Sequence, residues 1–274
     1  MTGDTIKLSS PATREFWEID VLFEDEHLLA LDKPARLLTS PDRYDPQRPN
    51  LAKLLHRDIE RGAPWAARRK MAYLMNAHRL DFETSGVLLF AKNKPALIAL
   101  ANLFGTEKPV KVYVALAQGP VPNDAFEVNV KLGPHPVKLG VMRADPKNGK
   151  QSTTRFKVRE KFAGSALLDC MPLTGRTHQI RVHLQQAGLR IFGDTTYGGE
   201  PLLLSRLKCE YRLKPNRTEK PLLSRVALHA EQLSLDHPVT GQRVHIEAPW
   251  PKDFTVAIKY LRRYAPAQSL VPPG

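Results

Sequence analysis

Short apolar runs separated by polar residues constrain the fold of this chain more than any other feature. They are rich in Val, Ile, Leu and Tyr, and several alternate apolar with polar residues, as in Val110–Val114, the pattern of a strand buried on one face. The runs expected to form strands are Ile19–Phe23, Leu28–Leu31, Gly86–Ala91, Val110–Ala117, Phe126–Leu132, Thr153–Arg159, Ala166–Met171, Ala227–Leu235 and Val244–Ala248. This pattern predicts a core built on a sheet.

Helical periodicity is rarer. The expected helices are Leu51–Glu60, Lys94–Phe104, His178–Ala187, Pro201–Leu213 and Phe254–Tyr264. Thr177 is expected to cap the third helix and Gly188 to end it. Because strands outnumber helices and βαβ alternation is rare, we expect an α+β fold with a mixed, mostly antiparallel central sheet flanked by helices. One domain is expected over residues 16–264, between flexible tails at residues 1–15 and 265–274, which lack periodicity.

Composition excludes several classes of protein. Hydrophobic residues make up 42% of the chain and charged residues 25%, so disorder of the whole chain is excluded. No uncharged stretch approaches the ~18 residues of a membrane helix, and the N-terminus lacks a signal-peptide pattern. The two cysteines, Cys170 and Cys209, are too few for a disulfide framework or a four-cysteine zinc site. We therefore expect a cytoplasmic protein that does not bind membranes.

An excess of basic residues points to a polyanionic partner. The net charge is +13, and most of it falls in the windows Lys131–Lys161 and Arg206–Arg225, with a third basic segment at Arg57–Arg79. Clustered cations gain free energy when they release the counterions condensed on nucleic acid. Solvated surface is the alternative interpretation, and the charge distribution favours nucleic acid over it.

The densest polar cluster, residues 77–86, leads into the apolar run Val87–Ala91. A loop anchored to a buried strand holds a catalytic group rigidly. Asp81 in this loop also fits the role of a turn cap, and spacing alone slightly favours that role. The residues of the loop therefore leave both roles open.

A second polar cluster, Gly175–His183, lies at an expected junction of strand and helix. Its two histidines, His178 and His183, are five residues apart, about 140° around a helix, which argues against a metal site. Arg176 and Arg181 have the same spacing, so their side chains point in different directions and must have different roles. One could face phosphate at the helix N-terminus and the other an inward carboxylate, or both could be solvated.

Together these clusters resemble those of the RluA-type pseudouridine synthases, which isomerise uridine in ribosomal or transfer RNA to its C5-glycoside. The motifs that carry the resemblance are Lys33–Thr39, His78–Gly86, Lys111–Tyr113, Gly175–His183, Gly193–Gly199, Leu228–Ala230 and His237–Gly241. Arg36 stands where the first motif usually has glycine, so it either restricts the backbone or adds an RNA contact. Fewer than twenty residues precede the first expected strand, so we expect no N-terminal RNA-binding domain.

The resemblance implies that the expected domain is catalytic, with Asp81 as nucleophile, Arg181 as its counter-charge, and Tyr113 as stacking surface and proton relay. It implies substrate-binding roles for Arg79, Arg176, His178 and Ile180. Arg79 would approach the gap left by a flipped nucleotide, or contact phosphate. Asp81 attacks the base or C1′, or stabilises a cationic sugar, and the residues leave these routes open.

The implied reaction breaks the C1′–N1 bond, rotates the base and bonds C5 to C1′. Because it involves no net redox change or hydrolysis, we expect neither a cofactor nor a metal. We expect an isomerase that acts as a monomer on structured ribosomal or transfer RNA. Two alternatives stay open, a non-catalytic RNA-binding or ribosome-associated protein on the same fold and a hydrolase that uses Asp81 and His78 as acid and base.

Overall fold

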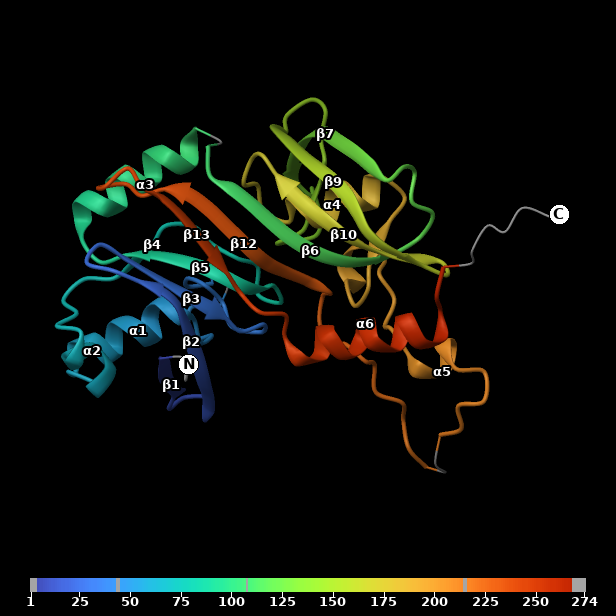
Figure 1. Cartoon of the computed structure of the whole chain (residues 1–274), viewed down its shortest axis with the longest axis horizontal. Helices are drawn as coiled ribbons and strands as arrows, with labels where there is room; N and C mark the ends of the chain where they lie inside the picture. Colours follow the sequence, from blue (N-terminus) through green and yellow to red (C-terminus); the bar gives the residue numbers. More distant parts are fainter. Residues whose placement is uncertain (1–3, 43–44, 107, 214–215, 268–274) are drawn as a thin grey trace. The chain divides into compact units, whose positions relative to one another are not determined.

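The computed structural model describes residues 4–42, 45–106, 108–213 and 216–267, and Figure 1 traces the chain. The protein divides into two compact units, one formed by Met1–Lys111 with Ala230–Pro249 and the other by Val112–His229 with Trp250–Gly274. Each unit contains antiparallel strand pairs with helices packed against its strands. The predicted α+β fold with a mostly antiparallel sheet is therefore confirmed.

The first unit contains most of the N-terminal half of the chain. Its elements are β1 (Thr5–Ser10), β2 (Glu15–Glu24), β3 (Leu28–Lys33), α1 (Leu51–Glu60), α2 (Pro64–Arg68), β4 (Met75–Asn76), β5 (Ser85–Ala91), α3 (Lys94–Gly105), β12 (Leu228–Asp236) from Ala230 onward, and β13 (Arg243–Glu247). Its strands follow the order β1, β2, β3, β5 and β12, with β4 on β5 and β13 on β12. Helix α1 packs on β1, and α3 packs on β5.

The second unit contains the remaining elements. They are β6 (Val110–Gln118) from Val112 onward, β7 (Ala125–Pro134), β8 (Met142–Ala144), β9 (Lys150–Phe162), β10 (Ser165–Pro172), α4 (Gln179–Gln186), β11 (Arg190–Ile191), a 3₁₀ turn (Thr195–Tyr197), α5 (Leu204–Leu207) and α6 (Lys252–Tyr264). The strands follow the order β6, β10, β9, β7 and β8, and β11 pairs with β6. Helix α4 contacts β7, β8, β9 and β10, so the sheet supports it along its length.

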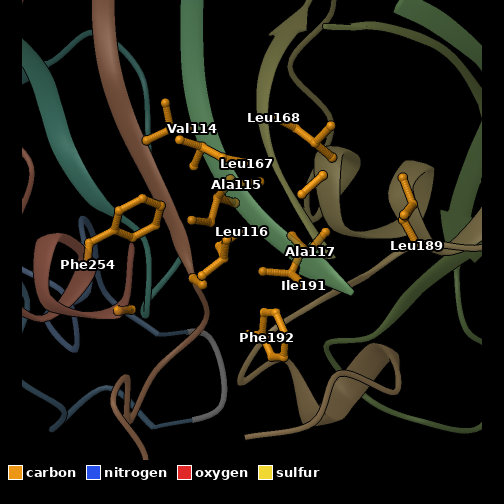
Figure 2. Close-up of a cluster of buried hydrophobic side chains, with 14 of the residues drawn as sticks. Val114, Ala115, Leu116, Ala117, Leu167, Leu168, Leu189, Ile191, Phe192 and Phe254 are labelled. Carbon is orange, nitrogen blue, oxygen red and sulfur yellow. The ribbon is translucent and has the colours of Figure 1, made fainter. Parts of the chain in front are cut away.

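The core of the second unit explains why the C-terminal part of β6 is continuously apolar. Val114–Ala117 are fully buried and pack among side chains from β10, β11 and α6. Figure 2 shows this run with Leu168 to its upper right, Phe254 to its left, and Ile191 and Phe192 below it. A strand covered on both faces has no solvent side and needs no polar alternation.

Two corrections concern the expected tails. Residues 5–10 form β1, which pairs with β2 and buries Ile6 and Leu8, so the expectation of a flexible tail over residues 1–15 is wrong for this segment. This strand contains only two apolar residues, Ile6 and Leu8, which are too few to mark a strand in the sequence. At the other end, Pro266 bridges to Phe162, so the expected tail over residues 265–274 begins later than predicted. Residues 1–3 and 268–274 lie outside the described residues.

The helices also differ from expectation in two places. Helix α4 begins at Gln179, and its N-cap is His178 in the left-handed region (φ 54°) instead of Thr177. The helix expected over Pro201–Leu213 shortens to the four residues of α5, none of which is buried, so tertiary packing contributes little to a longer helix. Gly188 has φ 78° directly after the C-cap residue of α4, which confirms its predicted role.

Candidate active site

The loop that carries Asp81 is fastened to the first unit on both sides of that residue. The hydroxyl of Thr39, a buried residue, donates to the carbonyl of Leu80 (3.0 Å) and accepts from the Leu80 N–H (3.1 Å). The backbone N–H of Arg36 donates to the carbonyl of Phe82 (2.7 Å). The Asp81 side chain is partly exposed. A partly exposed carboxylate therefore stands between two fixed neighbours, the arrangement that a positioned catalytic group requires.

Lys33 links the first motif to the loop that carries Asp81. Its side chain is fully buried, and its ammonium donates to the carbonyls of Pro34 (2.8 Å) and Leu37 (2.7 Å), with the Phe82 carbonyl at 3.5 Å. A buried ammonium is stable only when its N–H groups are satisfied. Lys33 therefore fixes the backbone that anchors the Asp81 loop, a role that the sequence did not indicate.

Arg36 occupies a backbone conformation that suits glycine. Its φ is +63°, in the left-handed region. This observation supports the first of the two interpretations drawn from the sequence, because a side chain restricts the backbone where the family motif has glycine.

We expect Arg36→Gly to raise the free energy of unfolding by about 0.5–1 kcal/mol. Relief of roughly 1–2 kcal/mol of left-handed strain exceeds the entropy that glycine adds to the unfolded chain. Arg36→Ala is the matched control, since it removes the same side chain but keeps the Cβ atom. Chemical unfolding of both variants checks this, and equal stability of the two would contradict it.

Gly86 fixes the other end of the loop, at the start of β5. Its φ is +111°, and a Cβ atom built on it would lie 2.1 Å from the carbonyl oxygen of Ala230 in β12. No side chain fits in that space. The close approach of the two backbones therefore requires glycine at this position.

His78 has a structural role in the same loop. Its Nε2 accepts from the backbone N–H of Leu89 (3.1 Å), and its ring lies beside Phe104. Burial, with a contribution from the Lys111 charge, lowers the pKa of His78 to about 4. The imidazole is therefore neutral at neutral pH and its Nε2 lone pair is occupied. This state does not suit the acid or base that the hydrolase alternative requires.

The second cluster centres on a buried ion pair in the second unit. Arg181 in α4 donates from Nε and Nη2 to the two carboxylate oxygens of Asp194, both at 2.7 Å. Asp194 is 1% exposed and Arg181 8%. The guanidinium also lies over the ring of Tyr197, 4.8 Å from its centroid. The bidentate pair uses two of the five guanidinium N–H groups and fixes the plane of the others.

His178 is held by the same tyrosine. Its Nδ1 lies 2.8 Å from the hydroxyl of Tyr197, which accepts from the backbone N–H of Met142 (2.9 Å). The two rings meet edge to face. The left-handed backbone of His178 turns the chain into α4, so this contact positions the side chain at the helix N-terminus.

Gln179 fastens the turn that carries Arg176. Its side-chain carbonyl accepts from the Thr174 hydroxyl (2.7 Å) and the Arg176 N–H (3.0 Å), while its amide donates to the Thr153 carbonyl (3.0 Å). Arg176 itself is exposed. Ile180, next in α4, is 6% exposed and belongs to the hydrophobic core cluster.

The predicted site residues fall in both units. Asp81 and the exposed Arg79 belong to the first unit. The second unit contains Tyr113, Arg176, His178, Ile180 and Arg181. Tyr113 lies on β6, half-buried, with one side packed against the core cluster. The roles assigned to these seven residues stay predictions.

His183 is fully buried beneath β9. Its Nε2 lies 2.9 Å from the hydroxyl of Ser152, which in turn donates to the Val130 carbonyl (2.6 Å), so Nε2 carries the proton. Nδ1 has no hydrogen-bond partner among the described residues. Burial lowers the pKa of His183 to about 4.

This pKa predicts a loss of stability in acid. Below pH 6.5 the unfolded chain binds a proton at His183 that the folded chain rejects until about pH 4, so stability falls across that window. Between pH 7 and pH 5 the loss is about 2 kcal/mol for this group. Urea unfolding at both pH values should show a smaller pH effect in His183→Asn. The exposed His245→Asn is the control and should retain the full effect.

Ion pairs within the protein account for part of the basic surface. In the window Arg57–Arg79, buried Asp58 binds Arg57 and Arg61, and Glu24 binds Arg69. In the window Lys131–Lys161, five exposed lysines have no ion-pair partner among the described residues: Lys131, Lys138, Lys147, Lys150 and Lys157. Of these two windows, Lys131–Lys161 is therefore the better candidate for a polyanion-binding surface.

No group of three His, Cys, Asp or Glu side chains suited to a metal ion occurs within the described ranges. In the same part of the chain, no helix has the length and apolar character needed to cross a membrane.

Known proteins resemble this chain over most of its length. A family model described as RNA pseudouridylate synthase matches residues 27–186. A ribosomal large subunit pseudouridine synthase D from Nitrosomonas europaea is 36% identical over 247 residues, covering 89% of this chain and 65% of that protein. A ribosomal large subunit pseudouridine synthase C from Vibrio vulnificus is 36% identical over 242 residues, covering 88% and 69%. The chain thus spans about two thirds of the length of these relatives.

A solved structure shares the fold. The human RNA pseudouridylate synthase domain containing 4 matches with a TM-score of 0.65 at 24% identity, covering 88% of this chain and 92% of that one. The resemblance inferred from the motifs is therefore confirmed by a family model, by sequence relatives and by a fold.

Proposed function

The chain belongs to the RNA pseudouridylate synthase family, and on that premise we propose that it isomerises uridines in structured RNA to pseudouridine with Asp81 as the nucleophile. One observation carries the assignment of Asp81. The family's catalytic loop is present, and Thr39 and Arg36 anchor the backbone on both sides of that carboxylate. A turn cap needs no such anchoring. We propose ribosomal RNA as the first substrate class to test, with transfer RNA as the second.

Arg181 is proposed as the group that holds the Asp81 carboxylate in place. Asp194 already neutralises much of the guanidinium charge, because the two groups form a bidentate pair in a buried setting. What Arg181 supplies to Asp81 is therefore directed N–H donors in a fixed plane more than net charge. Tyr197 and Asp194 together prevent the guanidinium from rotating away.

Tyr113 is proposed to stack on the uracil and to relay the proton that leaves C5. The reaction breaks the C1′–N1 bond and forms C5–C1′, C5 loses its proton, and N1 gains one. An aromatic face holds the detached base while it rotates, and a phenol transfers a proton over hydrogen-bond distance. Arg79, exposed two residues before Asp81, is proposed to contact the RNA where the nucleotide leaves the stack.

RNA recognition is proposed to rest on shape and phosphate contacts. The major groove of A-form RNA is too deep and narrow for side chains to read, so an enzyme of this kind meets its uridine in a loop or a disrupted helix. Exposed lysines of the window Lys131–Lys161 supply the phosphate contacts. We propose that the protein acts as a monomer.

This proposal predicts a salt-dependent effect for three lysines. Replacing Lys147, Lys150 and Lys157 together with glutamine should weaken RNA binding and reduce the slope of log Kd against log salt by about two to three. Arg155 is left unchanged because it binds Glu127. Filter binding at several salt concentrations measures the slope. An unchanged slope would remove this surface from the RNA interface.

The proposed function is tested by supplying RNA that lacks the modification. Ribosomal and transfer RNA from cells without the gene are incubated with the purified protein, and pseudouridine is mapped by mass spectrometry. We expect new pseudouridine at a small set of positions that the parent cells also modify. RNA that binds the folded protein but gains no pseudouridine would instead support the non-catalytic alternative.

A further inference from the structure

A pocket in the second unit has none of the residues proposed for catalysis in its lining. It has a volume of about 380 Å³ and is lined by Asn129, Val130, Lys131, Ala144, Pro146, Gln151 and Gln186. Gln186 is five residues beyond Arg181 in α4, about 140° around the helix and about 7.5 Å along it. The pocket therefore faces a different side of α4 from the pair formed by Arg181 and Asp194.

The strands make the floor of this pocket rigid. Lys131 of β7 pairs with Gln151 of β9, which places their side chains on one face of the sheet. Beneath them the Ser152 hydroxyl binds the Val130 carbonyl and the buried ring of His183. Figure 1 shows α4 beside β7 and β9, and contacts between these elements hold the helix there.

The turn between β8 and β9, which forms one wall of the pocket, is held in place as well. The Asp145 carboxylate accepts from the backbone N–H groups of Lys147 (3.2 Å) and Asn148 (3.0 Å), which closes the turn between β8 and β9. Gly149 completes the turn, and a Cβ atom on it would lie 2.5 Å from the Asp145 carbonyl oxygen. The backbone around the pocket is therefore fixed before a ligand binds, and binding requires little ordering of the backbone.

The polar groups of the pocket suit a nucleobase. The Gln151 amide donates to the side-chain carbonyl of Asn129. In this orientation the Asn129 amide has N–H donors, and the side-chain carbonyl of Gln151 is an acceptor. A base edge with one acceptor next to one donor matches that pair, as in the bidentate contacts of Asn and Gln with adenine. Gln186 adds a third carboxamide.

The rest of the lining fits a nucleotide of RNA. Lys131 supplies a cation for phosphate, and Ala144 and Pro146 supply apolar surface for the face of a base. The described lining contains no carboxylate that would repel phosphate. The volume is near the lower end of the ~300–1,000 Å³ typical of small-ligand sites, which suits one nucleotide.

We propose that this pocket binds one unpaired nucleotide of the RNA substrate, distinct from the target uridine. The base lies against Asn129 and Gln151, and the phosphate lies against Lys131. The inference rests on the proposed function, because that function makes RNA the ligand. It adds a base-reading site to a surface that otherwise contacts phosphates, and so contributes to the choice of RNA.

Binding of a seven-nucleotide single-stranded RNA of mixed sequence tests the site without turnover. Asn129→Ala and Gln151→Ala should each raise Kd about 5-fold or more with an unchanged salt slope, because a base contact is lost. Lys131→Gln should reduce the slope by about one. Asn123→Ala, an exposed amide outside the pocket lining, is the matched control and should leave Kd unchanged.

Isomerisation of full-length RNA gives a second readout. The two amide variants should raise KM and leave kcat unchanged at saturating RNA, since none of the residues proposed for catalysis lines the pocket. Unchanged Kd in both amide variants would overturn the inference even if the wild-type protein forms pseudouridine. If the wild-type protein binds RNA but forms none, a raised Kd in the amide variants still supports the pocket while the proposed function fails.

Discussion

Asp81→Asn is expected to abolish isomerisation while the protein stays folded and binds RNA. Asparagine keeps the size of the side chain but cannot act as a nucleophile, so the rate should fall by about 10⁴-fold or more. If Asp81 only capped a turn, the substitution would instead cost about 0.5–2 kcal/mol of stability and leave turnover per folded molecule intact. Thermal melting, RNA affinity and pseudouridine formation, measured on the same preparation, separate the two cases.

Arg181→Met extends this test to the pair. Methionine has a similar length but no N–H donors, so the Asp81 carboxylate would lose its proposed partner and activity should fall severely. Groups that act as one device are not additive, so the double variant should be scarcely worse than Asp81→Asn alone. Fully multiplicative losses would show that the two residues act independently.

Asp194→Ala should produce the largest loss of stability among the variants considered. It removes the bidentate partner of a guanidinium that is only 8% exposed, and breaking a buried ion pair costs about 3–5 kcal/mol. Activity should fall as well, because Asp194 fixes the plane of Arg181. Urea unfolding and pseudouridine formation at a temperature where the variant is folded measure the two effects separately.

The matched control for Asp194→Ala removes the same side chain from an exposed pair. Asp236 binds Arg243 with both side chains at least half exposed, so Asp236→Ala should change stability by less than about 1 kcal/mol. Equal effects of the two substitutions would contradict the structural role given to the buried pair.

The sequence predicted those elements whose apolar residues form a continuous run or recur with the period of a helix. The runs in β5 and β10 are apolar enough to identify, and α1 was predicted with the bounds that the structure shows. Strand β1 was not predicted because its only apolar residues are Ile6 and Leu8, although both are buried. Of the helix expected over Pro201–Leu213, only Leu204–Leu207 is helical, and none of these four residues is buried.

The candidate site was predictable only in part. The motifs indicated Asp81 and Arg181 through family resemblance, but nothing in their spacing shows that Asp194 binds Arg181 thirteen residues away. The roles of Lys33 and Thr39 depend on backbone carbonyls brought near by folding, which no side-chain pattern records. His178 was expected as the first residue of a helix, and the structure instead shows a left-handed N-cap whose side chain contacts Tyr197.

Release of tritium from C5-labelled uridine under single-turnover conditions tests the central claim most directly. With protein in excess over RNA, each C5–H bond broken is counted without interference from product release. Wild-type protein should release tritium from a defined fraction of uridines, and Asp81→Asn should release none above background while it binds the same RNA. Equal release by folded Asp81→Asn would contradict the assignment of Asp81 as the nucleophile of an RNA pseudouridine synthase.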